Sequence, residues 1–302
     1  MEAAVAERAW NARLPLAIAV AALLAAVAPL GALLIGPIVF GVPHVIGDMR
    51  ALWLRKPGGF GGATAACVAL ALLAMTLLRI VLLTGAPIPI EAELACGIAA
   101  VACAAIGGAR GRRSRLYWAL GVAVLGGLAL LAARETLLLL AHAHNLVALL
   151  LWLAWSPSRG SRRGVLLFYI VGAACVAAAS NASVGREALG AFDGARLVRE
   201  LAPGLENPLG DALVRSFAFA QLVHYGIWSW QLPGGSRTTL RQDFGLRGLW
   251  LCALVCIAVP ICGWFAPVET RSTYLQIAIA HGWIELSVIA YLLARSGTLR
   301  GS

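Results

Sequence analysis

Apolar stretches of transmembrane length recur along the whole chain, separated by short polar gaps. A bilayer core requires about 20 predominantly apolar residues per helix. The pattern therefore predicts an all-α polytopic membrane bundle of about ten transmembrane helices. They cover residues 14–30, 37–54, 63–83, 90–106, 118–132, 136–155, 165–179, 212–231, 249–265 and 274–293.

Arginine and lysine concentrate in alternate gaps between these stretches, whereas the other gaps are short or mixed in sign. Because cytoplasmic loops carry an excess of basic residues, we expect both termini in the cytoplasm and the even-numbered helices running inward. The basic gaps contain Arg50, Arg55 and Lys56; Arg110, Arg112, Arg113 and Arg115; Arg159, Arg162 and Arg163; Arg237, Arg241 and Arg247; and Arg295 and Arg300.

One longer polar segment, residues 181–211, is expected as an outer-face loop of a single transmembrane domain that covers residues 1–302. Its stretch 195–201 is expected to form a short amphipathic helix on that surface. Near the outer end of the third predicted helix, Arg79 is expected to extend to the surface or to pair with Glu91 or Glu93.

The composition excludes a soluble globular protein. Hydrophobic residues make up 61% and charged residues 13% of the 302 residues, too few charges to cover a soluble surface. The net charge of +10 does not indicate nucleic-acid binding, because the arginines do not gather into one patch. We expect an integral protein of the bacterial inner membrane, with the lipid bilayer as its surroundings and no nucleic-acid partner.

All five histidines lie inside predicted transmembrane helices, where titratable side chains are costly and usually functional. With the orientation given by the charges and a rise of about 1.5 Å per residue, four inward-running helices bring them to one layer, roughly 10 to 15 Å below the outer boundary. A hydrogen bond across helices explains any single one equally well, but it gives no reason for a shared depth. We therefore expect a common metal or haem site among His44, His142, His144, His224 and His281.

His142 and His144 lie two residues apart, which places them about 200° apart around a helix. We therefore do not expect both to bind one ion. One of the pair is expected to be a ligand, and the other to face the substrate or to support a ligand. The sequence leaves open which is which.

A carboxylate follows the first and the last histidine at a spacing of four residues, as Asp48 and Glu285. Residues four apart share one helical face, so each acid is expected to bind a metal or to orient a liganding imidazole. Asp48 alternatively pairs with Arg50 or Arg55 near the cytoplasmic surface. The candidate catalytic residues are Asp48, Glu285, Asn145 and Tyr225, and Gln221 is a further polar neighbour of the histidines.

Sites rich in imidazole and lacking thiolates suit iron, copper or zinc. Non-haem iron is favoured, because O2 is apolar and enriched in membranes whereas zinc-dependent hydrolysis needs a supply of water. Haem is an alternative, since facing helices could supply two axial histidines, although the chain contains no CxxCH motif. We expect non-haem iron, with haem, copper or zinc as alternatives.

Residues 40–48, FGVPHVIGD, resemble the Gly-x-Pro-His-Gly-x-x-Asp stretch of the Brp/Blh-type β-carotene 15,15′-dioxygenases. The resemblance covers these residues and the pattern of isolated intramembrane histidines. It implies a membrane enzyme whose iron is held by histidines of several helices and whose product is retinal. The chain differs at Val45, where those enzymes have glycine, and at Met49, where they often have a second histidine.

We therefore hypothesise a non-haem iron oxygenase of a lipophilic polyene, such as a carotenoid, or of another lipid, with O2 as co-substrate. His44, His224, His281 and one of His142 or His144 would hold the ion. Three alternatives come from other classes. They are a membrane haem cytochrome, a proton-coupled transporter that uses the buried acids and histidines, and a scaffold protein.

Overall fold

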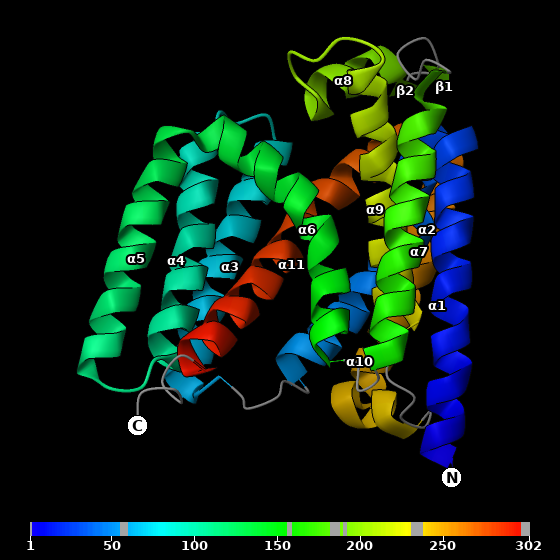
Figure 1. The fold of residues 1–302 in the computed structure, drawn as a ribbon. Helices are drawn as coiled ribbons and strands as arrows, with labels where there is room; N and C mark the ends of the chain where they lie inside the picture. The colour runs from blue at the N-terminus through cyan, green and yellow to red at the C-terminus, as the bar shows by residue number, and fades with distance from the viewer. Residues whose placement is uncertain are drawn as a thin grey trace. The chain divides into compact units, whose positions relative to one another are not determined.

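The computed structural model describes residues 2–54, 60–155, 159–181, 188–189, 192–230 and 238–296. Within them the chain forms eleven α-helices (Figure 1), which confirms the all-α prediction. The helices are α1 (Glu2–Val27), α2 (Pro29–Asp48), α3 (Gly62–Leu83), α4 (Ile90–Gly108), α5 (Arg112–Leu131), α6 (Ala133–Trp155), α7 (Arg159–Ala178), α8 (Gly194–Leu201), α9 (Leu209–Trp230), α10 (Thr238–Phe265) and α11 (Pro267–Ser296). Shorter elements are the π-helix η1 (Met49–Leu54), the 3-10 turn η2 (Ala179–Asn181) and the antiparallel strands β1 (Ala188–Leu189) and β2 (Phe192–Asp193).

Seven of the described helices are long and apolar enough to cross a membrane, namely α2, α3, α4, α5, α6, α10 and α11. The protein is therefore an integral membrane protein. Each of the ten predicted segments coincides with a helix over most of its length, but α7 and α9 carry charged side chains such as Arg162 and Arg215. The apolar part of α1, Leu14–Val27, is shorter than a full span. Length and composition thus support seven of the ten predicted spans.

The beginning of α2 differs from the prediction. This helix begins at Pro29 and includes Pro37 and Pro43, whereas the first predicted span, residues 14–30, runs across the break between α1 and α2 at Ala28. Proline lacks an N–H and normally interrupts a helix. Helices within membranes tolerate it where other groups satisfy the carbonyls that proline leaves without a donor.

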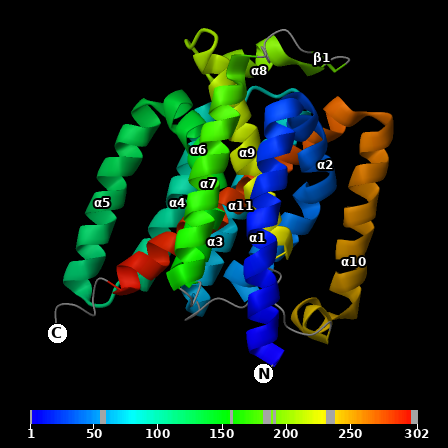
Figure 2. The same cartoon turned by 45° about the vertical axis from the view of Figure 1, so that its right-hand side comes forward.

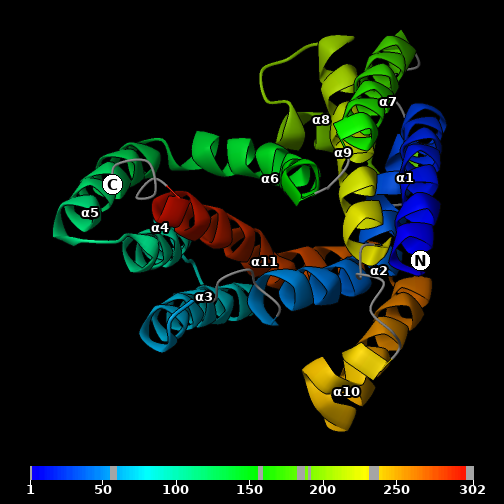
Figure 3. The same ribbon diagram turned by 60° about the horizontal axis from the view of Figure 1, so that its bottom comes forward.

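The chain folds into two compact units. The first unit comprises Met1–Gly47 and His142–Ser272, and the second comprises Asp48–Ala141 and Thr273–Ser302. Within the first unit, α1 packs against α7 and α9 (Figure 2), and α8 packs on α9. Within the second unit, α4 lies between α3 and α5 (Figure 3).

Close packing in the first unit holds α9 against α1 and α7. Gly172 of α7 allows the approach of Phe219, because a Cβ at Gly172 would lie 3.0 Å from the Phe219 Cζ. The Phe219 ring also lies 5.0 Å from that of Tyr169. One turn earlier on α9, the buried Arg215 donates from Nη1 to the carbonyl of Ala26, near the end of α1. These contacts fix the helix that carries His224.

The second unit is held by small residues and by one buried ion pair. A Cβ at Gly97 of α4 would overlap the indole of Trp283 on α11, so this close contact requires glycine. Arg79 of α3 forms an ion pair with Glu93 of α4 and donates from Nη1 to the Gln276 Oε1. The predicted pairing of Arg79 with Glu93 is therefore confirmed.

The segment that leads into α9 contains the short helix expected over 195–201. It is present as α8, and the Asp193 side chain caps it by accepting a hydrogen bond from the Ala195 N–H at 2.8 Å. Arg196 and Glu200 form an exposed ion pair one turn apart, with 2.7 Å between Nε and Oε1. Charged side chains thus cover one face of α8, while Leu197 on the other face is buried.

Candidate metal centre

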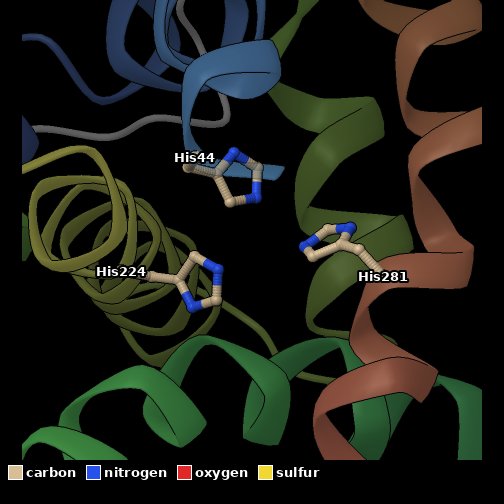
Figure 4. Close-up of side chains that lie close together, drawn as sticks. All are labelled: His44, His224 and His281. Carbon is tan, nitrogen blue, oxygen red and sulfur yellow. The ribbon is translucent and has the colours of Figure 1, made fainter. Parts of the chain in front are cut away.

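Three imidazoles from different helices gather within the first unit. His44 comes from α2, His144 from α6 and His224 from α9. The ring centroids of His44 and His224 lie 5.2 Å apart (Figure 4), and those of His144 and His224 lie 4.4 Å apart. The His44 and His224 side chains are buried. The central ring of His224 therefore contacts both of the others.

Two pairs of histidines in this cluster have nitrogens close enough to share an ion. His44 and His224 each offer a ring nitrogen, and these lie within 4.8 Å of each other, as do nitrogens of His144 and His224. An ion with metal–nitrogen bonds of about 2.1 Å holds two imidazole nitrogens up to about 4.2 Å apart. The cluster could therefore hold a metal ion.

The orientation of His44 suits a ligand. Its Nδ1 lies 3.2 Å from the carbonyl of Phe40, one turn back on α2. A carbonyl oxygen only accepts hydrogen bonds, so Nδ1 carries the proton of the neutral ring and Nε2 keeps its lone pair. A hydrogen bond from the second ring nitrogen is the usual support for a metal-binding histidine.

The other histidine of α6 has a different environment. His142 donates from Nε2 to the carbonyl of Leu201 at 2.9 Å, and its ring packs edge-on against Phe217 at 5.0 Å. Because His142 and His144 point to opposite sides of α6, His142 ties this helix to the end of α8. The structure brings His144, rather than His142, to the cluster.

Polar side chains border the cluster on α9 and α6. The ring of Tyr225 lies 4.5 Å from that of His44, and the hydroxyl of Tyr225 accepts a hydrogen bond from the Gln221 Nε2 at 2.9 Å. Tyr225 and Gln221 are both buried, as is Asn145, which follows His144. Tyr225, Gln221 and Asn145 therefore lie in the first unit with the histidines that the sequence placed them beside.

The remaining candidates belong to the second unit. Glu285 and Asp48 are both fully buried, and the two carboxyl groups interact electrostatically. His281, one turn before Glu285 on α11, donates from Nδ1 to the Ala278 carbonyl, which leaves Nε2 as the acceptor. Neither carboxylate oxygen of Asp48 accepts a hydrogen bond within the described part of the chain, and Arg55, one of its expected partners, lies outside the described residues.

One residue next to this site was not predicted from the sequence. Arg271, in the first turns of α11, belongs to the first unit and interacts electrostatically with Tyr225. In the sequence, Arg271 resembles the basic residues that commonly lie near helix ends at the membrane interface, so it did not stand out. A possible signal was Pro37, because a proline inside a membrane helix leaves a carbonyl one turn earlier in need of a donor.

Comparison of the chain with known protein families, with curated proteins and with solved structures finds no match.

Proposed function

We propose that this protein is a membrane metalloenzyme, a non-haem iron oxygenase that acts on a lipophilic polyene such as a carotenoid, or on another lipid. The observation that carries the proposal is the gathering of His44, His144 and His224 from three helices of the first unit. Neutral imidazoles without thiolates favour iron, copper or zinc over Mg²⁺ or Ca²⁺. The resemblance of residues 40–48 to the carotenoid dioxygenases favours iron among these metals.

The proposed ligands are His44, His144 and His224. On the sequence argument of shared depth, we propose that His281 supplies a further imidazole. Its Nδ1, like that of His44, is occupied by a carbonyl of its own helix. Asp48 and Glu285 are proposed as additional ligands or as acceptors that orient imidazoles.

The bound iron would supply the activation of O2 for oxidation of the lipid. The residues around it would orient the imidazole ligands and exclude water from the site. The Phe40 carbonyl sets the orientation of the His44 ring, and Tyr225 with Gln221 borders the same ring. The surrounding helices are apolar, so the lipid and O2 both reach the site from the bilayer.

Metal analysis combined with an absorption spectrum tests the proposal on the protein purified in detergent. We expect bound iron and no Soret band. His44→Gln and His224→Gln are expected to lose most of the iron, because each removes an imidazole ligand. His142→Gln is the matched control and is expected to keep the iron, since a glutamine amide can still donate to the Leu201 carbonyl. Iron retained in both of the first two variants, or a Soret band, would overturn the proposal.

A second candidate function is favoured by the buried Asp48–Glu285 pair in the second unit. Ionisable side chains inside a membrane also mark proton pathways in transporters. Reconstitution into vesicles with an imposed pH gradient separates the two functions. A transporter would move protons with its solute whether or not metal is present, whereas the proposed oxygenase would not.

A further inference from the structure

Arg271 is held in a fixed position by two contacts within the first unit. Its Nε donates to the carbonyl of Leu33 on α2 at 2.6 Å. Its guanidinium carbon lies 4.9 Å from the centroid of the Phe192 ring, on β2, in a cation–π arrangement. Both contacts leave the two terminal nitrogens of the guanidinium unused, and these are the atoms that bind anions in pairs.

The sequence of α2 explains the first contact. The carbonyl of Leu33 would normally accept a hydrogen bond from the N–H of residue 37, but Pro37 has no N–H. The carbonyl is therefore available to a side chain, and Arg271 occupies it. One proline thus creates the anchor that fixes a guanidinium at this level of α2.

The charge of Arg271 is not neutralised by a direct ion pair. Within the described residues, no carboxylate lies within ion-pair distance of it. Glu200 attracts it only from a longer range, and Arg196 already holds the Glu200 Oε1 at 2.7 Å. A partly buried cation without a counterion is unfavourable, and an anionic ligand would relieve that cost.

Tyr225 connects this cation to the histidine cluster. A Cβ at Gly36 would lie 3.5 Å from the Tyr225 Cε2, and the Tyr225 ring reaches His44 at 4.5 Å. The hydroxyl of Tyr225 accepts from Gln221 and interacts electrostatically with Arg271, so its own proton is left to donate to a ligand.

The positions on α2 that these groups contact follow helical spacing. Leu33, Gly36, Phe40 and His44 recur every three or four residues and so share one face of the helix. From Leu33 to His44 this face extends about 16 Å. It carries a cationic group at one end and the imidazoles at the other, and between them the Tyr225 and Leu222 side chains of α9 pack against Gly36.

We propose that Arg271 and Tyr225 bind the oxyanionic head group, a carboxylate or a phosphate, of an amphiphilic lipid whose apolar chain extends into the bilayer. The guanidinium offers the paired N–H groups that match such oxygens. That this lipid is the substrate rests on the function proposed above, whereas its binding at Arg271 does not.

Binding of radiolabelled oleate to the immobilised, detergent-purified protein tests this proposal. Oleyl alcohol, which has the same chain without the charge, is the matched ligand. We expect oleate to bind at least about tenfold more tightly than oleyl alcohol, as befits hydrogen bonds to a charged group. Arg271→Gln is expected to abolish that preference, Arg271→Lys to keep part of it, and Tyr225→Phe to weaken it. Arg113→Gln, which removes an exposed arginine of α5 in the second unit, is the control and is expected to change nothing.

A second arm distinguishes the two sources of the oxyanion. Preferential retention of phosphatidate over diacylglycerol, measured by native mass spectrometry, reports a phosphate-headed lipid, and the oleate assay reports a carboxylate. Equal binding of oleate and oleyl alcohol, together with equal retention of phosphatidate and diacylglycerol, would overturn the proposal whatever the variants do. Iron is measured on the same samples. A protein without iron that still binds oleate through Arg271 would refute the oxygenase and leave this site standing.

Discussion

A histidine inside a membrane is defined chemically by which ring nitrogen keeps its lone pair. His44 uses Nδ1 for a carbonyl of its own helix, so Nε2 is the nitrogen that keeps its lone pair. His142 uses Nε2 for a carbonyl of another segment, and its ring is packed against Phe217. The first arrangement is typical of a supported ligand, and the second is typical of a structural hydrogen bond between helices. Two histidines in equally apolar sequence thus have different hydrogen-bond environments.

The structural role of His142 gives a prediction at the same scale. His142→Phe removes the donor to the Leu201 carbonyl and should lower the free energy of unfolding by about 0.5–1.5 kcal/mol, because a part-buried hydrogen bond is lost. Thermal unfolding in detergent measures this. The iron content should stay at the level of the unsubstituted protein. A loss of iron without a loss of stability would show that His142 is itself a ligand.

Helix positions in the second unit are set by glycines, which predicts the effect of adding one methyl group. Gly97→Ala would place a Cβ inside the indole of Trp283 and should destabilise the protein by about 1–3 kcal/mol. Gly121→Ala on α5 is the matched control, since no atom lies within 4 Å of its added Cβ. It should be neutral or stabilise the helix by up to about 1 kcal/mol. Equal unfolding temperatures for the two variants would contradict the close contact of α4 with α11.

At the scale of elements, apolar length predicts where helices are, but not which of their faces meet. Every predicted span coincides with a helix over most of its length, because long apolar segments in lipid satisfy their own backbone as helices. The start of α2 was missed, since Pro29, Pro37 and Pro43 obscure it. The choice of His144 over His142 was left open, because it depends on how α6 is turned toward α9. That rotation is fixed by distant contacts such as the one between His142 and Leu201.

The whole molecule raises the question of how many helices cross the bilayer. The positive-inside pattern predicts ten crossings with both termini in the cytoplasm, whereas length and composition support seven. The two counts differ in parity. Ten crossings leave the termini on the same side, and seven would leave them on opposite sides. The three helices in question are α1, α7 and α9, and all of them belong to the first unit.

Reporter fusions at the two termini therefore decide whether the number of membrane crossings is even or odd. Green fluorescent protein fluoresces only in the cytoplasm, and alkaline phosphatase is active only outside it. We expect fluorescence from fusions at both termini, and phosphatase activity from an insertion after Gly204, in the segment between α8 and α9. A fusion in the basic gap between α4 and α5, at Arg110, is the cytoplasmic control. Fluorescence at one terminus with phosphatase activity at the other would refute ten crossings. An odd number of crossings would leave at least one of α1, α7 and α9 outside the bilayer core, and if that helix is α9, the depth argument that unites the histidines fails.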